Sequence, residues 1–332
     1  MARHRAVVVG PGATPRLRPG GPGRGARAAA RRRARAVAGR GRVRLKVLVH
    51  AAPRREDRRM TVWICRTCAV EHADTDSPPE ICEICTDERQ WVPATGQAWT
   101  TLEEMRELGH LVAMYEVEPG LLGLVAEPHV GIGQQALLAC TPEGNVLWDP
   151  LGFLDEDTVR RVRRAGEVVA IAASHPHMFG AQVEWSRALG GVPVLVNQAD
   201  ARWLAREDDA VRYWSGRVTP VPGFVMHQIG GHFPGNAVAT WTGADGVGVL
   251  LCGDTIGPNP DRRTVAFMRS YPNRIPLSGA VAQRVARDIL ELDFDRIYGN
   301  FGNTIPSEGR TAVRQSAARH AAWARGDHDH LT

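Results

Sequence analysis

The residues with the most evident chemistry are two histidines that follow an apolar run. The stretch "EVVAIAASHPHMFG" places His175 and His177 one residue apart, directly after a segment with the pattern of a buried strand. Two imidazoles at such a strand end are well placed to bind one metal ion together. Further along, "GGHFPG" places His232 in a glycine-rich turn, and "GVLLCGDTI" places Asp254 at the end of another apolar strand. These four side chains predict a metal site.

A second set of metal-ligating side chains consists of four cysteines in two C-x-x-C pairs, namely Cys65, Cys68, Cys82 and Cys85. The spacing C-x2-C-x13-C-x2-C is close to that of zinc ribbons, in which two such knuckles close a tetrahedral thiolate site. It predicts a zinc-ribbon-like or rubredoxin-like unit with four cysteine ligands over residues 60–96 that binds Zn²⁺, with iron as the alternative because it uses the same geometry. Four thiolates complete the site, so we expect His72 at the surface. The two ligand sets are separate in sequence, and we expect each to keep its ion when the other is lost.

The charge of the chain is divided unequally. Residues 1–59 hold 17 arginines, one lysine and 2 acidic residues, whereas the whole chain has 41 basic and 36 acidic residues. A segment of arginine, alanine, glycine and proline without apolar periodicity cannot bury enough surface to fold, so we predict disorder over residues 1–59. An arm that binds nucleic acid is one interpretation. The interpretation we prefer is that translation begins at Met60 in a GC-rich bacterial genome, and nucleic acid is then not a partner.

The remainder, residues 97–332, has an alternating αβ pattern. Apolar strands are expected at "HLVAMYEV", "QQALLAC", "NVLW", "EVVAIAAS", "VPVLVN", "NAVATW" and "GVLLCGD". Helices are expected at "DEDTVRRVRRAG", "LSGAVAQRVARDILEL" and "EGRTAVRQSAARHAAWAR". Several strands precede the first clear helix, which favours stacked layers over a doubly wound sheet. No apolar run approaches the ~18 residues of a membrane span, and C-x-x-C pairs of the metal-binding kind favour a cytoplasmic protein.

Four polar residues at strand ends, in this chain order, make residues 110–325 similar to the metallo-β-lactamase superfamily. The resemblance implies an α/β fold, a four-layer αβ/βα sandwich with a metal site at one edge of its two sheets. The stretch "WDPLG" resembles the family's first motif and implies that Asp149 orients a metal ligand. The main motif of the family, H-x-H-x-D-H, stands here as "HPHMFG", so Phe179 and Gly180 replace an aspartate and a histidine.

The family usually binds two metal ions, and this sequence keeps the ligands of the first ion but lacks most ligands of the second. The resemblance assigns the first ion to the three histidines His175, His177 and His232. Of the ligands of the second ion only Asp254 remains, since an asparagine, Asn300 or Asn303, stands where the last histidine is usual. The resemblance therefore implies one zinc ion with an open position for a water molecule, and Asp254 as the residue that orients or deprotonates that water.

We therefore expect a mononuclear zinc hydrolase of a small ester, thioester, lactone or lactam. The second hypothesis is a protein that kept the fold but lost hydrolysis and serves as a binding or redox module, although a di-iron centre would need carboxylates at positions 179 and 180. A small-molecule substrate is implied, and a homo-oligomer stays open. The side chains that we expect near the mouth of the site, where they could hold an anionic substrate, are Arg262, Arg263, Arg269 and Tyr271.

A chain that begins at Met60 should fold and bind metal as the full chain does, because residues 1–59 lack any pattern that builds a core. Thermal unfolding of both chains, combined with metal analysis, checks this. A large drop in Tm on removal of residues 1–59 would contradict it.

Overall fold

Two large β-sheets and one small sheet organise the part of the chain that the computed structural model describes, residues 61–332. The predicted extension at 1–59 lies outside the described residues. A seven-stranded sheet contains, in spatial order, β10 (Val211–Trp214), β9 (Val194–Asn197), β8 (Val168–Ala172), β7 (Asn145–Trp148), β6 (Gln135–Ala139), β5 (Leu121–Glu127) and β4 (Leu111–Glu118). Strands β4 to β7 form an antiparallel meander, and β7 to β10 run parallel.

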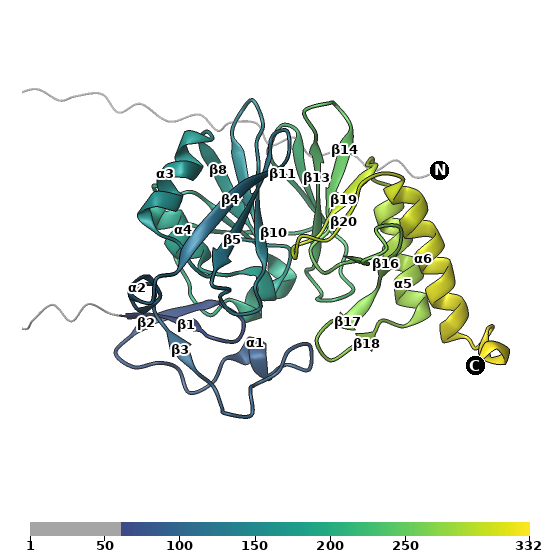
Figure 1. Ribbon diagram of the computed structural model, residues 1–332, viewed down its shortest axis with the longest axis horizontal. Coiled ribbons are helices and arrows are strands. Elements are labelled where there is room, and N and C mark those ends of the chain that lie inside the picture. The colour runs from purple at the N-terminus through teal and green to yellow at the C-terminus, as the bar shows by residue number, and fades with distance from the viewer. Residues whose placement is uncertain (1–60) are drawn as a thin grey trace, which may run out of the picture. The chain divides into compact units, whose positions relative to one another are not determined.

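The second large sheet has six strands and faces the first (Figure 1). It contains, in spatial order, β11 (Arg217–Val221), β12 (Phe224–Gln228), β13 (Ala237–Thr242), β14 (Gly248–Leu251), β19 (Arg296–Tyr298) and β20 (Thr304–Ile305). Between β14 and β19 the chain forms two short hairpins, β15 (Gly257–Pro258) with β16 (Val265–Ala266), and β17 (Met268–Ser270) with β18 (Ile275–Pro276).

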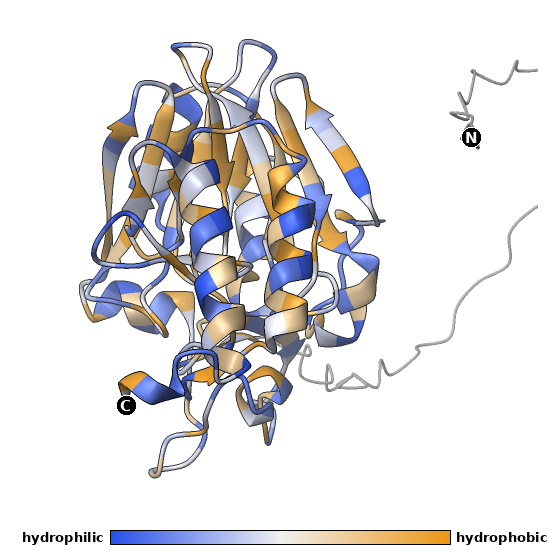
Figure 2. Cartoon of the chain, turned by 90° about the vertical axis from the view of Figure 1, so that its right-hand side faces the viewer, coloured by the Kyte–Doolittle hydropathy of each residue, from blue (hydrophilic) through white to orange (hydrophobic). Residues whose placement is uncertain are grey.

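Four layers result, because each large sheet buries one face against the other sheet and the opposite face against helices. Trp148, Phe224 and Trp241 belong to the core between the sheets. Helices α3 (Glu156–Arg164) and α4 (Gln182–Leu189) cover the seven-stranded sheet, whereas α5 (Gly279–Leu290) and α6 (Gly309–Ala324) lie side by side on the other. Figure 2 shows the alternating polar and apolar residues of α5 and α6. The predicted αβ/βα sandwich is confirmed.

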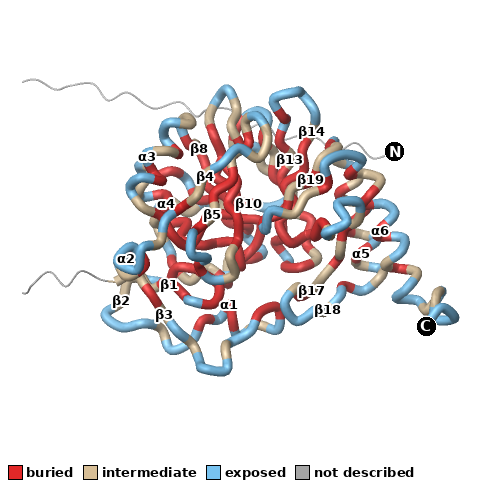
Figure 3. Tube along the Cα trace, in the orientation of Figure 1, coloured by how far each residue is buried: buried red, intermediate tan, exposed pale blue. Residues whose placement is uncertain are grey.

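Two of the predicted helices, α3 and α5, begin at residues whose side chains cap the first turn. The Asp155 side chain accepts a hydrogen bond from the Thr158 N–H, and the Ser278 side chain accepts one from the Val281 N–H, so both satisfy otherwise free amides of a first turn. Gly166 follows the end of α3 with a φ of +134°, which glycine adopts without strain. Figure 3 shows that burial concentrates in the strands between the helical layers.

The cysteine unit forms the small sheet and does not stand apart from the sandwich. Its strands, in spatial order, are β2 (Glu71–Thr75), β1 (Thr61–Cys65) and β3 (Trp99–Thr100), and its short helix is α1 (Glu83–Thr86). Strand β3 lies beyond the predicted boundary at residue 96, and α2 (Leu102–Glu107) follows it. The remaining short helical turns are η1 (Pro176–Met178), η2 (Gln198–Trp203) and η3 (Asp329–Leu331). The described residues, 61–332, belong to one compact unit, so the three sheets share one tertiary structure.

One side of the contact between the cysteine unit and the sandwich is a polar cluster around Glu71, called the clasp below. The Glu71 N–H donates to the Gly180 carbonyl over 2.9 Å. The Glu71 carboxylate accepts the N–H groups of Val183 and Glu184, in the first turn of α4, where the N-cap residue supplies no side-chain hydrogen bond. Arg206, itself buried, completes the clasp with an ion pair of 2.6 Å to Glu71. A helix of the sandwich therefore receives its N-terminal cap from the cysteine unit.

The other side of the contact is a close approach of two backbones. Ala69, in the loop after Cys68, has a φ of +65° and is fully buried. A Cβ atom placed on Gly152 would lie 2.3 Å from the Ala69 carbonyl oxygen, and one on Gly131 would lie 2.6 Å from the Ala69 nitrogen. Only glycine fits at these two positions of the sandwich.

Gly152→Ala should lower the free energy of unfolding by about 3 kcal/mol, because the added methyl group meets a backbone oxygen that cannot turn away. Gly96→Ala is the control: its φ is +91° but nothing lies within 4 Å of the added Cβ, so it should cost about 1 kcal/mol. Urea unfolding measures both. Equal effects in the two variants would show that the contact is looser than described.

Candidate metal centres

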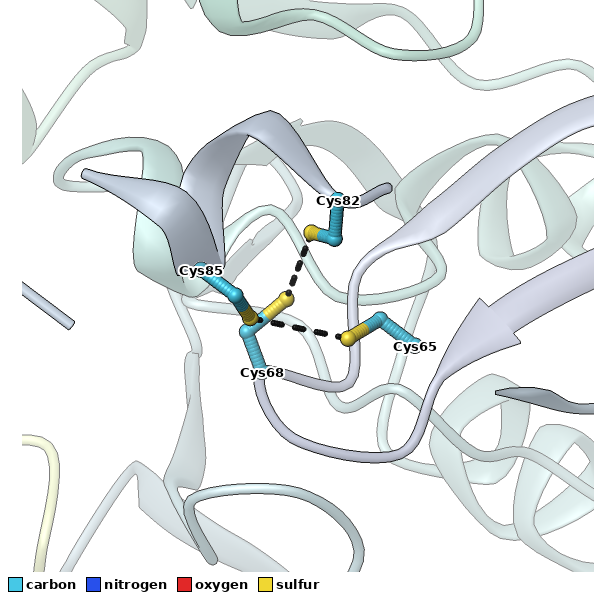
Figure 4. A group of neighbouring side chains, drawn as sticks. All are labelled: Cys65, Cys68, Cys82 and Cys85. Atoms are coloured by element: carbon cyan, nitrogen blue, oxygen red, sulfur yellow. Dashed lines mark hydrogen bonds between the residues drawn. The ribbon is translucent and has the colours of Figure 1, made fainter. Parts of the chain in front are cut away.

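The four cysteines converge into one buried cluster, as Figure 4 shows. Cys65 ends β1, Cys68 lies in the following loop, and Cys82 and Cys85 lie at the start and inside α1. The Sγ atoms of Cys65 and Cys85 are 3.6 Å apart, and so are those of Cys68 and Cys82. All six cysteines are free, so these sulfurs are not joined in disulfides. A Zn–S bond of ~2.3 Å gives tetrahedral S···S edges close to this separation.

The four sulfurs of the cysteine cluster are not equivalent. The Gln97 Nε2–H group donates to Cys65 Sγ over 3.1 Å, and hydrogen bonding to Cys68 lowers the pKa of Cys65 to about 7. Hydrogen bonding among the sulfurs also lowers the pKa of Cys82, to which His72 contributes, whereas burial raises the pKa of Cys68 and hydrogen bonding to Cys65 raises that of Cys85. The expectation that His72 lies at the surface is wrong: it is buried, edge-on to Trp99 at 4.6 Å. Its place beside the sulfurs was not visible in the spacing of the cysteines.

The predicted histidine cluster also forms. His175 follows β8, His177 lies in η1, His232 lies in the turn between β12 and β13, and Asp254 follows β14. Their ligand atoms all lie within 4.8 Å of one another, and all four residues are buried. The strand ends of the two sheets meet at one edge, which brings together residues up to 79 positions apart in the sequence.

The distances within this cluster suit a metal ion. His232 Nε2 lies 3.3 Å from His177 Nδ1, and Asp254 Oδ2 lies 3.4 Å from His175 Nε2 and 3.7 Å from His232 Nε2. His175 Nε2 and His177 Nε2 are buried without a hydrogen-bond partner. Burial together with the neighbouring His175 lowers the pKa of His232 to about 3 and that of His177 well below its ordinary value. The imidazoles of His177 and His232 are therefore neutral, each with a lone pair available for an ion.

Hydrogen bonds on the far side of two rings set their orientation. Ser174 Oγ lies 2.9 Å from His175 Nδ1 and donates to Asp149 Oδ2, while the Ser174 N–H donates to Asp149 Oδ1. His232 Nδ1 faces the Met268 carbonyl oxygen at 3.2 Å. These contacts place the ring proton on Nδ1 and leave Nε2 free in both histidines. Asp149 lies where the sequence placed it, but it reaches His175 through Ser174, a residue that the sequence reasoning missed.

Asp254 is held as a carboxylate at the edge of the cluster. Burial alone would raise its pKa, but the neighbouring His175, His232 and Asn300 outweigh burial and lower the pKa below its ordinary value. Asn300, which stands where the family's last histidine is usual, is buried. Asn303 lies elsewhere and donates to the Pro258 carbonyl.

Of the four predicted substrate-binding residues, Tyr271 lies beside the histidine cluster, and the three arginines have other surroundings. The ring of Tyr271 lies 5.9 Å from that of His232, and its hydroxyl is buried without a hydrogen-bond partner. Arg269 instead pairs with Glu88 of the cysteine unit at 2.6 Å. Arg262 and Arg263 are exposed in the β15–β16 turn. A role for these three arginines in substrate binding stays a prediction, whereas Tyr271 stands beside the cluster.

The positions that would carry the second ion's ligands are filled by packing. Phe179 is buried in the apolar core below α4. Gly180 has a φ of +52°, and a Cβ atom there would lie 2.1 Å from the Pro150 carbonyl oxygen. A histidine therefore cannot stand at position 180 without moving the backbone, and its carbonyl is already bound by Glu71. His227, on β12, lies 3.3 Å from Thr240 Oγ1 and is not part of the cluster.

The class of protein follows from these observations. Two facing sheets with helices outside, and three histidines and an aspartate at their shared edge, define a protein of the metallo-β-lactamase fold. No protein-family model matches the chain. The chain is 40% identical over 264 residues to the uncharacterized protein YmaE of Bacillus subtilis (strain 168), a match that covers 79% of this chain and 96% of YmaE. The chain therefore belongs to the same family as YmaE.

Solved structures with a similar chain course are metallo-β-lactamases. DIM-1 aligns with a TM-score of 0.48 at 13% identity, covering 64% of this chain and 98% of DIM-1. VMB-1 aligns with a TM-score of 0.49 at 11% identity, over 64% of this chain and 98% of VMB-1. A B3 metallo-β-lactamase with an active-site glutamic acid aligns with a TM-score of 0.45 at 16% identity, over 68% and 96%.

We expect two metal ions per chain, one at the four cysteines and one at the three histidines with Asp254. His177→Ala should remove one ion, because it leaves only two of the three imidazole ligands that the proposed zinc site uses. Elemental analysis of the purified protein and of this variant is the measurement, with His227→Ala as a control that keeps both ions. Three ions per chain would mean that a further set of ligands exists.

Proposed function

We propose that the protein is a metal-dependent hydrolase of a small ester, thioester, lactone or lactam. The observation that carries the proposal is the convergence of three buried imidazoles and the Asp254 carboxylate, with ligand atoms within 4.8 Å of one another. Three imidazole ligands with Asp254 beside them would leave one zinc position open for water, which is typical of catalytic rather than structural zinc sites.

In this proposal His175 Nε2, His177 Nδ1 and His232 Nε2 hold one zinc ion, with Asp254 beside it. A zinc ion bound there would supply a water molecule of lowered pKa and polarise a carbonyl group. The hydrogen bonds that the Nδ1–H groups of His175 and His232 donate, to Ser174 Oγ and to the Met268 carbonyl, keep these two rings in the tautomer that offers Nε2 to the ion. Phe179, in place of a family carboxylate, is buried in the apolar core and offers no ligand for a second ion.

Asp254 then serves as the base. Its lowered pKa keeps it ionised at neutral pH, so it can accept the proton of the attacking water. The water oxygen forms a bond to the carbonyl carbon, and the proton passes from Asp254 to the leaving oxygen, sulfur or nitrogen as that bond breaks. Tyr271, whose buried hydroxyl has no partner within the described residues, can donate a hydrogen bond to the carbonyl oxygen as its negative charge develops.

The alternative, a binding or redox module that lost hydrolysis, is less well supported. A di-iron centre would need a carboxylate at position 179 and a ligand at position 180, where the chain has a core phenylalanine and a glycine that admits no side chain. The cysteine unit could still bind iron. We assign zinc to it, since the sulfurs are enclosed in a rigid buried cluster that suits a structural ion.

The proposal places the protein in the cytoplasm, where a reducing environment keeps the six free cysteines from forming disulfides. In the part of the chain that the structure describes, no helix has the length and apolar character needed to cross a membrane. The expected partner is a small carbonyl substrate.

The zinc-loaded protein should hydrolyse at least one member of a panel of small esters, thioesters, lactones and lactams. Asp254→Asn should lower kcat by about 100-fold or more, because the amide cannot accept the proton. Tyr271→Phe should lower kcat by about 100-fold with little change in KM if the hydroxyl acts only in the transition state. Thr240→Ala, which alters a side chain beside His227 and not the cluster, is the control. Zinc-loaded protein inactive on the whole panel would contradict the proposal.

A further inference from the structure

The carbonyl of one candidate metal ligand is bound by an arginine of the cysteine unit. Arg89 is buried, and its Nε–H donates to the His232 carbonyl oxygen over 2.8 Å. Its guanidinium lies 4.1 Å from the centre of the ring of Phe233, the next residue in the same turn. That turn is also fixed from the sandwich, where the Gly235 N–H donates to Asp200 Oδ1. Arg89 is therefore the contribution of the cysteine unit to the shape of the His232 turn.

Arg89 itself is held in a well-defined conformation. Its guanidinium forms an ion pair of 2.6 Å with Asp87, and its own N–H donates to the same carboxylate. The Arg89 carbonyl accepts the Ser270 hydroxyl over 3.0 Å, and Asn273 Nδ2 donates to the carbonyls of Glu88 and Gln90. The segment 87–90 is thus bound on one side by the β17–β18 hairpin, which also carries Met268, the residue whose carbonyl faces His232 Nδ1.

The segment 87–90 is bound on its other side by the cysteines. It directly follows α1, a helix of only four residues that contains Cys85 and begins after Cys82. A single turn of this length has little stability of its own, so its conformation depends on what anchors it. The thiolates of Cys82 and Cys85 are those anchors when an ion joins them to the other two cysteines. A short stretch of backbone therefore connects a cysteine ligand of one site to the arginine that contacts a histidine ligand of the other.

We propose that Arg89 is a positioning residue through which metal occupancy of the cysteine site sets the geometry and affinity of the histidine site. The inference rests on the proposed metal site at the three histidines, but not on the reaction catalysed there. With the cysteine ion bound, Arg89 holds the His232 carbonyl and the Phe233 ring, and the His232 ring keeps its direction. Without it, the segment 87–90 loses one of its two supports and the histidine turn relaxes. Because linkage is reciprocal, an ion at the histidines also stabilises the cysteine site.

This inference reverses the expectation from sequence that each site keeps its ion when the other is lost. The ligand sets are separate along the chain, but the structure places Arg89 of the cysteine unit against His232. Loss of the cysteine ion should therefore weaken metal binding at the histidines.

The test uses the full chain with zinc at the cysteines and cobalt(II) titrated into the histidine site. Cobalt at imidazoles is followed by its visible d–d bands, and cobalt or iron at the cysteines would be recognised by thiolate charge-transfer bands. Arg89→Met, which keeps the apolar stem and removes the donors, should weaken cobalt binding about tenfold to 100-fold and change the d–d bands. Arg89→Lys should recover part of the affinity. Arg106→Met is the matched control, since Arg106 donates to the Leu154 carbonyl far from either ligand set in sequence.

A purely structural role for Arg89 would lower Tm but leave the cobalt affinity and spectrum of the folded protein unchanged, and this result would overturn the proposal. An equal loss in Arg106→Met would also overturn it. If Arg89→Met does not fold, Asn273→Ala decides in its place: it loosens the same segment and touches no ligand, so a weaker cobalt site supports the proposal and an unchanged site refutes it. Cobalt affinity is read without any substrate, so an inactive protein would refute the hydrolase proposal alone.

Discussion

The constraint on which the structure depends is the burial of three imidazoles and one carboxylate whose ligand atoms face one another. His175 Nε2, one of the nitrogens proposed to bind the ion, is buried without a hydrogen-bond partner, an arrangement that costs free energy unless a cation satisfies its lone pair. The strands must end where they do, because a shift of one residue would turn His175 away from His232 and Asp254. The Asp149–Ser174–His175 contacts then fix which nitrogen is offered to the ion.

Among the described residues, the positions where a second metal ion of the family would be bound lack its ligands. The packing around these positions also leaves no space for such ligands. Phe179 and Gly180 do not leave a gap: the phenylalanine fills core, and the glycine lets the backbone pass under the Pro150 carbonyl. The carbonyl of Gly180 accepts a hydrogen bond from the N–H of Glu71, and the side chain of Glu71 also caps α4. The cysteine unit therefore docks on the segment that would carry the second ion's ligands. Restoring those ligands by substitution alone would meet both the backbone at Pro150 and the docked unit.

The cysteine unit is packed against the sandwich and contacts the turn that carries His232, so it is not a separate module. Ile64 and Val70 of the unit share one apolar core with Leu151 and Phe153 of the sandwich. Arg89 reaches the His232 turn, and Glu88 pairs with Arg269, so one of the arginines expected to face the substrate is engaged in holding the unit in place. In small units of this kind the bound ion contributes to folding. Through the contact between Arg89 and His232, the geometry of the histidine site can therefore depend on the ion at the cysteines.

The sequence by itself determined the class of the fold and the two groups of ligand-type side chains that the structure brings together. It could do so because strand-end motifs and C-x-x-C spacing are local patterns. Strands such as β5 and β12 and the short helix α4 were not anticipated, since their patterns are weak and their burial comes from neighbours. Only the tertiary structure decided that His72 is buried, that Arg269 is paired with Glu88, and that Arg89 reaches His232. These contacts join residues 27 to 181 positions apart in the sequence, and no local spacing encodes which surfaces of two units will meet.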